Sequence, residues 1–208
     1  MRRRVGVLIS GSGSNLQALL DATADAAFPA EIALVISNRP GAGGLARAEA
    51  AGVPTLTIDH RAHEGRALFE DALHAALTEH GVETVCLAGF MRVLTEGFVR
   101  RWAGRMLNIH PSLLPSFKGL HVHAQALAAG VRVSGCTVHV VTPDLDDGPI
   151  IGQAAVPVLP DDTEETLAAR VLAAEHRLYP AALRAFVTEE GGVEGDGRTD
   201  AAGLILSV

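Results

Sequence analysis

Short apolar runs alternate with amphipathic stretches through the first half of this chain, and this alternation limits the folds open to it. The apolar runs lack polar alternation, which is typical of strands buried on both faces, and the stretches between them carry apolar residues at helical spacing. Strands are expected at residues 5–9, 32–36, 53–58, 84–88 and 106–109, and helices from 16 onward and at 45–51, 64–80 and 96–102. The pattern predicts an α/β fold with a doubly wound, mostly parallel sheet.

The pattern changes after His110. Residues 133–141 and 150–158 alternate like an antiparallel strand pair, and residues 124–129 and 164–186 are expected to be helical. Pro180 lies inside the longer helix and predicts a kink or a break there. We therefore expect a single Rossmann-like domain over residues 1–188, with an antiparallel strand pair in its C-terminal half. Residues 189–208 are rich in Gly and Asp and are expected to form a tail, which could include an edge strand at 204–206.

Composition narrows the class of protein. The 208 residues are 48% hydrophobic and 20% charged, as in a soluble globular protein, and the net charge of −7 disfavours a nucleic-acid binder with a broad basic surface. Cys86 and Cys136 lie in apolar, strand-like runs, which fits a reducing cytoplasm better than a disulfide framework. Neither a signal peptide nor a membrane-spanning run is evident. We expect a cytoplasmic protein without a membrane or nucleic-acid partner.

A glycine-rich loop, Gly11-Ser12-Gly13-Ser14-Asn15, follows the first predicted strand and precedes a helix. Glycines let the backbone turn tightly and approach a ligand, and the start of a helix offers N–H groups to an anion. The dinucleotide fingerprint would need glycine at position 16, where Leu16 stands, and the Gly-Lys-Ser/Thr of a Walker loop is absent. The loop is either a phosphate site or a plain strand-to-helix turn.

Asn108 and His110 stand at the end of a predicted central strand, where the ligand crevice of an open α/β sheet forms. Two residues apart, they point to the same side of the strand. An amide and an imidazole side by side suit an oxyanion and a proton transfer, and the acidic loop 144–147 could favour the imidazolium. The alternative is a structural histidine with a solvated acidic turn, and geometry has to decide between the two.

Several motifs together resemble the phosphoribosylglycinamide formyltransferase family of folate-dependent enzymes. The matching runs, in order over about residues 5 to 186, are Ile9-Ser10-Gly11-Ser12-Gly13-Ser14-Asn15-Leu16, Leu87-Ala88-Gly89-Phe90-Met91-Arg92-Val93-Leu94, Asn108-Ile109-His110-Pro111-Ser112-Leu113-Leu114-Pro115, Leu145-Asp146-Asp147-Gly148-Pro149 and Glu175-His176-Arg177-Leu178-Tyr179-Pro180. The third run is very specific to folate-dependent formyl transfer and hydrolysis, and the first narrows the resemblance to the glycinamide ribonucleotide enzymes.

The resemblance implies a role for each of these motifs. The implied catalytic residues are Asn108, His110 and Asp146, with Asp146 chosen because the family pattern reads Leu-Asp-x-Gly. The residues implied to bind the phosphate and ribonucleotide are Gly13, Ser14, Asn15 and Glu175. The residues implied to bind the folate are Arg66, Met91, Arg92, Val93, Leu94 and Asn108.

The activity implied by the resemblance is formyl transfer from 10-formyltetrahydrofolate, as co-substrate, to the amine of 5-phosphoribosylglycinamide in de novo purine biosynthesis, by a monomer or homodimer. No metal is expected, because His121-x-His123 lacks a third ligand at the usual spacing. Similar formyltetrahydrofolate hydrolases carry an extra N-terminal domain, and methionyl-tRNA formyltransferases carry a C-terminal RNA-binding domain; we expect neither here. A non-catalytic phosphate- or nucleotide-binding module is the remaining alternative, but it would leave Asn108, His110 and Asp146 unexplained.

Overall fold

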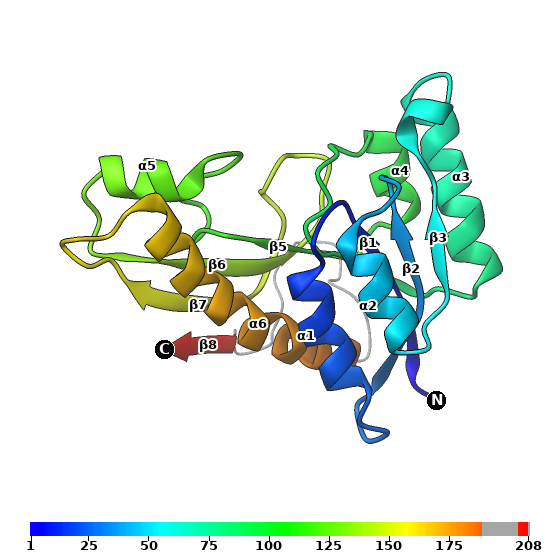
Figure 1. Ribbon diagram of the computed structural model, residues 1–208, viewed down its shortest axis with the longest axis horizontal. Coiled ribbons are helices and arrows are strands. Elements are labelled where there is room, and N and C mark those ends of the chain that lie inside the picture. The colour runs from blue at the N-terminus through cyan, green and yellow to red at the C-terminus, as the bar shows by residue number, and fades with distance from the viewer. Residues whose placement is uncertain (189–203, 208) are drawn as a thin grey trace. The chain divides into compact units, whose positions relative to one another are not determined.

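The structure, a computed structural model, describes residues 1–188 and 204–207 (Figure 1). The chain divides into two compact units, Met1–Leu107 and Asn108–Val208. The elements of the first unit are β1 (Arg3–Ile9), α1 (Ser14–Thr23), β2 (Ala30–Ser37), α2 (Gly43–Ala50), β3 (Thr55–Thr57), the 3-10 helix η1 (His60–Ala62), α3 (Arg66–Glu79), β4 (Thr84–Leu87) and α4 (Glu96–Arg101).

The strands of the first unit are parallel, in the order β3-β2-β1-β4. β1 lies inside this sheet, where Val7 pairs with Val35 of β2 and with Cys86 of β4. All three side chains are fully buried. Burial on both faces explains why these strands are continuous apolar runs, and the predicted parallel sheet is confirmed.

Helices cover both faces of this sheet (Figure 1). A Cβ added at Gly6 would lie 2.5 Å from a methyl of Leu77 on α3, and one added at Gly44 on α2 would lie 2.5 Å from the Cδ1 of Ile9. Gly6 and Ile9 are three apart on β1 and therefore face opposite sides. The doubly wound arrangement is thus confirmed, with α3 on one face and α2 on the other.

The second unit contains the predicted antiparallel pair. Its elements are the end of β5 (Met106–His110), α5 (Val122–Ala128), β6 (Val133–Val140), β7 (Ile150–Pro157), α6 (Glu164–Thr188) and β8 (Leu204–Ser207). β6 and β7 run antiparallel, and β8 adds a parallel strand beside β7 at the edge. The pair and the edge strand near 204–206 are both confirmed; the rest of the predicted tail, 189–203 and 208, lies outside the described residues.

Two elements differ from the sequence expectation. β3 is shorter than the predicted 53–58 strand, and its Leu56 is 37% exposed, as suits the edge of the sheet. α6 continues through Pro180 without the break that the proline allowed. The helix packs along β6 and β7, and burial of Leu178, Tyr179 and Ala182 around the proline offsets the one helical hydrogen bond that proline cannot donate.

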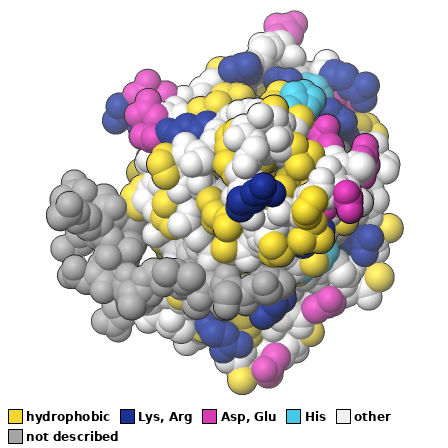
Figure 2. Space-filling view, turned by 90° about the vertical axis from the view of Figure 1, so that its left-hand side faces the viewer, with side chains coloured by type: hydrophobic (Ala, Val, Ile, Leu, Met, Phe, Trp, Pro, Cys, Tyr) yellow, Lys and Arg dark blue, Asp and Glu magenta, His cyan; other side chains and the backbone are white. Residues whose placement is uncertain are grey.

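The surface carries charges of both signs. On the face drawn in Figure 2, Lys and Arg side chains lie among Asp and Glu, with hydrophobic side chains between them. Among the described residues, no helix is both long and apolar enough to cross a membrane.

Candidate active site

The glycine-rich loop between β1 and α1 takes its shape from α2. Gly13 has a left-handed φ of 73°, and a Cβ there would lie 2.5 Å from the Cα of Gly44. The Gly44 N–H donates to the carbonyl of Gly11 at 3.1 Å, and Arg47 Nε donates to the carbonyl of Ser12 at 2.9 Å. Position 13 therefore requires glycine, both for its backbone angle and for its close approach to α2.

The loop leads directly into the N-terminal end of α1, which begins at Ser14. No side chain caps this end of the helix, and its first turn has no acidic residue. Unpaired N–H groups and the positive end of the helix dipole together suit an anion. The Ser14 side chain is half-buried beside them, whereas Asn15 is buried at 9% exposure. The local geometry thus fits a phosphate site made by Gly13, Ser14 and Asn15.

The proposed folate residues of the first unit lie on two elements. Met91 and Val93 are 63% and 61% exposed in the irregular segment between β4 and α4, while Arg92 and Leu94 are half-buried there. Arg66 is exposed at the first turn of α3. The segment presents backbone and apolar side chains to solvent, and Arg66 presents a cation.

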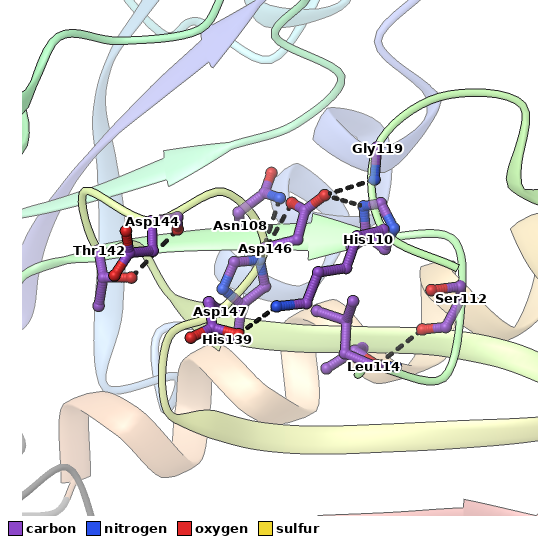
Figure 3. Close-up of polar contacts among 12 residues, drawn as sticks. Asn108, His110, Ser112, Leu114, Gly119, His139, Thr142, Asp144, Asp146 and Asp147 are labelled. Carbon is purple, nitrogen blue, oxygen red and sulfur yellow. Dashed lines mark hydrogen bonds and ion pairs between the residues drawn. The ribbon is translucent and has the colours of Figure 1, made fainter. Parts of the chain in front are cut away.

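In the second unit, a cluster of polar side chains forms where β5, β6 and the acidic loop meet (Figure 3). His110 Nδ1 lies 3.5 Å from Oδ2 of Asp146, and both side chains are less than a tenth exposed. His110 Nε2 lies 3.0 Å from the carbonyl oxygen of Phe117. Both ring nitrogens thus face oxygen atoms, so an N–H at either position has an acceptor near it.

His139 of β6 joins the cluster, and the sequence analysis did not single it out. Its Nε2 lies 3.2 Å from Nδ2 of Asn108 and 3.9 Å from Oδ1 of Asp146, while its Nδ1 lies 3.1 Å from the carbonyl of Val140. Since the carbonyl can only accept, Nδ1 donates and Nε2 accepts from the Asn108 amide, which makes the ring neutral. Burial lowers the pKa of His139, in agreement with a neutral ring. A lone histidine in the apolar strand 136–140 was the available sequence signal.

Asp146 is held in the cluster by its backbone and by the loop opposite. Its φ is 50°, in the left-handed region that side chains seldom adopt, and its Oδ2 accepts the Gly119 N–H at 2.9 Å. Lys118, next to that glycine, pairs with Asp147. The 117–119 loop therefore contacts both aspartates of the Leu-Asp-Asp-Gly-Pro motif.

Close packing at the base of the acidic loop explains why residue 148 is a glycine. The N–H of Val140 donates to the carbonyl of Pro149 at 2.8 Å, which closes the loop. A Cβ added at Gly148 would lie 1.7 Å from the carbonyl oxygen of Val140. No side chain fits at 148, so glycine allows the chain to return to β7 with Asp146 facing His110.

Glu175 lies on α6 in the same unit and is 6% exposed. It stands near Cys136 of β6, where burial and then the charge of Glu175 raise the pKa of the thiol to about 12. Both cysteines are free and buried, as their apolar runs predicted. The geometry around Cys136 is that of an inert thiol.

The two histidines of the His-x-His pair have different surroundings. His121 is exposed and precedes α5 with a φ of 56°, whereas His123 is half-buried, and burial lowers its pKa. Within 1–188 and 204–207, no group of three or more His, Cys, Asp or Glu side chains is placed to hold a metal ion.

Comparison with known proteins identifies the family. Residues 3–183 match the model of the formyl transferase family, so this chain belongs to that family. Phosphoribosylglycinamide formyltransferase of Escherichia coli is 46% identical over 180 residues, which are 86% of this chain and 85% of that protein. The crystal structure of glycinamide ribonucleotide transformylase 1 from Symbiobacterium toebii superposes with a TM-score of 0.90 at 52% identity, covering 93% of this chain and 92% of that one.

Longer relatives match as well. The trifunctional purine biosynthetic protein adenosine-3 of Bos taurus is 56% identical over 183 residues, or 88% of this chain. The match spans only 18% of that protein's length.

Proposed function

We propose that this chain transfers a formyl group from 10-formyltetrahydrofolate to the primary amine of 5-phosphoribosylglycinamide, in de novo purine biosynthesis in the cytoplasm. The observation that carries the proposal is the cluster in which Asp146 lies beside both His110 and His139, while His139 orients Asn108. The cluster brings together Asn108, His110 and Asp146, the three residues to which the mechanism below assigns formyl transfer, in a chain of the formyl transferase family.

The proposed reaction is a direct attack by the amine. Its nitrogen lone pair forms a bond to the formyl carbon, and the carbonyl electron pair moves to oxygen to give a tetrahedral intermediate. Collapse re-forms the C=O bond and breaks the bond to the folate nitrogen. The attacking nitrogen loses one proton, and the folate nitrogen gains one. The amine is already a nucleophile, so no step is assigned to an activated serine, a thiol or a metal.

Asn108 is assigned to the oxyanion. One N–H of its amide is held by His139, and the second has no partner among the described residues. Because the neutral His139 ring accepts at Nε2, the NH₂ group of Asn108 has to point toward His139. A preorganised donor of this kind stabilises charge as it develops on the formyl oxygen.

His110 and Asp146 are assigned to the proton transfer. The Asp146 carboxylate faces Nδ1 at 3.5 Å, and Nε2–H is assigned as the second donor to the intermediate. The Phe117 carbonyl occupies the acceptor position at Nε2. Productive binding therefore displaces this carbonyl from Nε2; Phe117 itself has a left-handed φ of 56°.

The remaining positions are assigned to binding. Gly13, Ser14 and Asn15 at the start of α1 would hold the phosphate, and Glu175 the glycinamide or ribose end. The folate would contact Arg66, Met91, Arg92, Val93, Leu94 and Asn108. We propose small-molecule substrates only, with neither nucleic acid nor membrane as partner, and a monomeric or homodimeric enzyme.

A spectrophotometric assay with a 10-formyl folate analogue, run with and without glycinamide ribonucleotide, tests the proposal. We expect deformylation that depends on the ribonucleotide and is lost in His110→Ala. Deformylation without the ribonucleotide would instead indicate a hydrolase. Ligand binding without any deformylation would indicate a non-catalytic module.

A further inference from the structure

The segment 89–94 of the first unit is held at its two ends by buried polar side chains from distant parts of the chain. Near its start, the Met91 N–H donates to Oγ of Ser10 at 2.8 Å. Just beyond its end, the Thr95 N–H donates to Oε1 of Glu70 at 2.8 Å, and the Thr95 hydroxyl donates to Oε2. Ser10 and Glu70 are each 4% exposed.

Ser10 makes a junction between this segment and the glycine-rich loop. Its N–H donates to the carbonyl of Gly89 at 3.1 Å, and its hydroxyl donates to Oδ1 of Asn38 at 2.6 Å while accepting from Met91. The Asn38 amide is fixed in turn by His60, 3.2 Å away. The next residue after Ser10 is Gly11, the first of the proposed phosphate loop.

Glu70 is a buried carboxylate, and no cation of the described residues forms an ion pair with it. Both oxygens are used on Thr95, and the Thr95 hydroxyl also accepts the Phe98 N–H at 3.3 Å as the cap of α4. A buried carboxylate is costly unless hydrogen bonds replace its hydration. Two donors from one residue meet that need and define where Thr95 lies relative to α3.

Between the two anchors, the backbone is open. Among the described residues, the N–H and C=O groups of Arg92, Val93 and Leu94 make no hydrogen bond to the protein. Backbone groups held in a fixed geometry and left unpaired can recognise the polar edge of a planar heterocycle. The same groups on a mobile segment would lose affinity, because binding would first have to order them.

We propose that Ser10 and Glu70 are positioning residues that hold the 89–94 backbone in the conformation that binds the folate. The inference rests on the proposed function, since it assumes that this segment contacts the formyl donor. Neither residue touches substrate; each acts through the backbone amide that it accepts from. Ser10 lies between the two binding segments and therefore also fixes the position of the phosphate loop relative to the folate segment.

The first test compares the KM values of the two substrates. One buried hydrogen bond corresponds to about a tenfold change in an equilibrium constant, so Ser10→Ala and Glu70→Ala should each raise the KM for the formyl folate about tenfold. The KM for the ribonucleotide and kcat should change much less. Glu70→Gln keeps an acceptor for Thr95 and should restore most of the affinity.

Matched controls separate positioning from general loss of stability. Ser37 is also a buried serine of this unit, but its hydroxyl bonds only to the backbone of Arg39. Glu79 is an exposed glutamate of α3. Ser37→Ala and Glu79→Ala should leave the KM for the formyl folate unchanged. An unchanged KM in Ser10→Ala and Glu70→Ala, or a rise that Ser37→Ala reproduces, would overturn the inference.

Amide hydrogen exchange gives a readout that does not depend on turnover. Ser10→Ala should accelerate exchange at Met91, and Glu70→Ala should accelerate it at Thr95, with core amides of β1 unchanged. Unchanged exchange at both positions would refute the anchoring while leaving the proposed function intact. A wild-type protein that neither transfers formyl nor binds the folate analogue, despite protected Met91 and Thr95 amides, would overturn the proposed function and the folate role of the segment with it.

Discussion

The hydrogen bond to His139 fixes the orientation of the Asn108 side-chain amide. An amide in solution offers its oxygen and its nitrogen equally, but Nε2 of a neutral imidazole accepts only from the NH₂ end. Burial lowers the pKa of His139 and keeps its ring neutral, and the Val140 carbonyl accepts the one ring N–H at Nδ1. The result is a donor held in place before substrate arrives, which is the property that an oxyanion site needs.

Substitution of Asn108 tests this donor. Asn108→Ala is expected to lower kcat by about 10²–10³-fold, because one preorganised oxyanion donor is lost. The thermal midpoint should change little, since Asn108 is only partly buried. Steady-state kinetics on the purified variant, with circular dichroism to confirm folding, provide the check. A kcat near that of the wild type would remove Asn108 from the mechanism.

At the scale of elements, loops bring the site together while strands and helices support it. β5 supplies Asn108 and His110, β6 supplies His139, and the loop between β6 and β7 supplies Asp146. That loop is closed at its base by the Val140–Pro149 hydrogen bond and by the close packing of Gly148. α6 begins beside the end of β7 and braces this hairpin.

Gly148→Ala should damage both stability and activity. The added methyl would overlap the carbonyl oxygen of Val140, so the base of the loop has to move and Asp146 moves with it. We expect a lower thermal midpoint and a loss of kcat. Gly97→Ala, where a Cβ would meet only ordinary contact with Thr95, is the matched change and should lower neither. Wild-type kcat in Gly148→Ala would show that the loop base does not control Asp146.

An ion pair and side-chain hydrogen bonds hold the start of α6. Arg170 contacts both oxygens of Asp162, at 2.6 and 2.8 Å, and this contact, the largest of several hydrogen bonds, holds the pKa of the carboxyl well below its usual range. Asp162→Ala should lower the thermal midpoint at neutral pH, while exposed Asp161→Ala should not. Because the folded pKa is depressed, the contribution is present above the unfolded pKa of about 4 and disappears in acid. Differential scanning calorimetry at neutral pH and in acid, below the unfolded pKa, measures this contribution. Equal thermal midpoints for Asp162→Ala and Asp161→Ala at neutral pH would contradict the assignment.

For the molecule as a whole, His139 and His123 set a dependence of stability on pH. Burial lowers the folded pKa of His139 and of His123 below the unfolded value of 6.5. The unfolded chain therefore binds more protons than the folded one in this range, so stability rises with pH. The free energy of unfolding should be highest above about pH 6.5 and should fall as the pH is lowered through and below it.

Urea denaturation at a series of pH values measures this dependence. His139→Gln should flatten the slope, because one of the two groups that titrate on unfolding is gone. His121→Gln changes an exposed histidine and should leave the slope as it is. A slope unchanged in His139→Gln would mean that His139 is not the group that loses its proton on folding.

Much of this protein could be predicted from its sequence. Periodicity alone predicted the parallel strands, their helices and the later antiparallel pair, because burial on two faces, on one face or on a helical stripe each leaves its own spacing of apolar residues. The motif resemblance predicted the family. The single-domain interpretation of 1–188 and the roles of the site residues stay predictions.

Only the tertiary structure decided which side chains meet. Asn108 and His139 are 31 positions apart, and Ser10 and Met91 are 81 apart, so no local pattern records either contact. The continuous path of α6 through Pro180 was likewise decided by packing against β6 and β7. Local spacing determines which residues are buried, since burial depends on the periodicity of one element. The partner of a buried polar group depends on where another element lies, and that is settled only when the chain has folded.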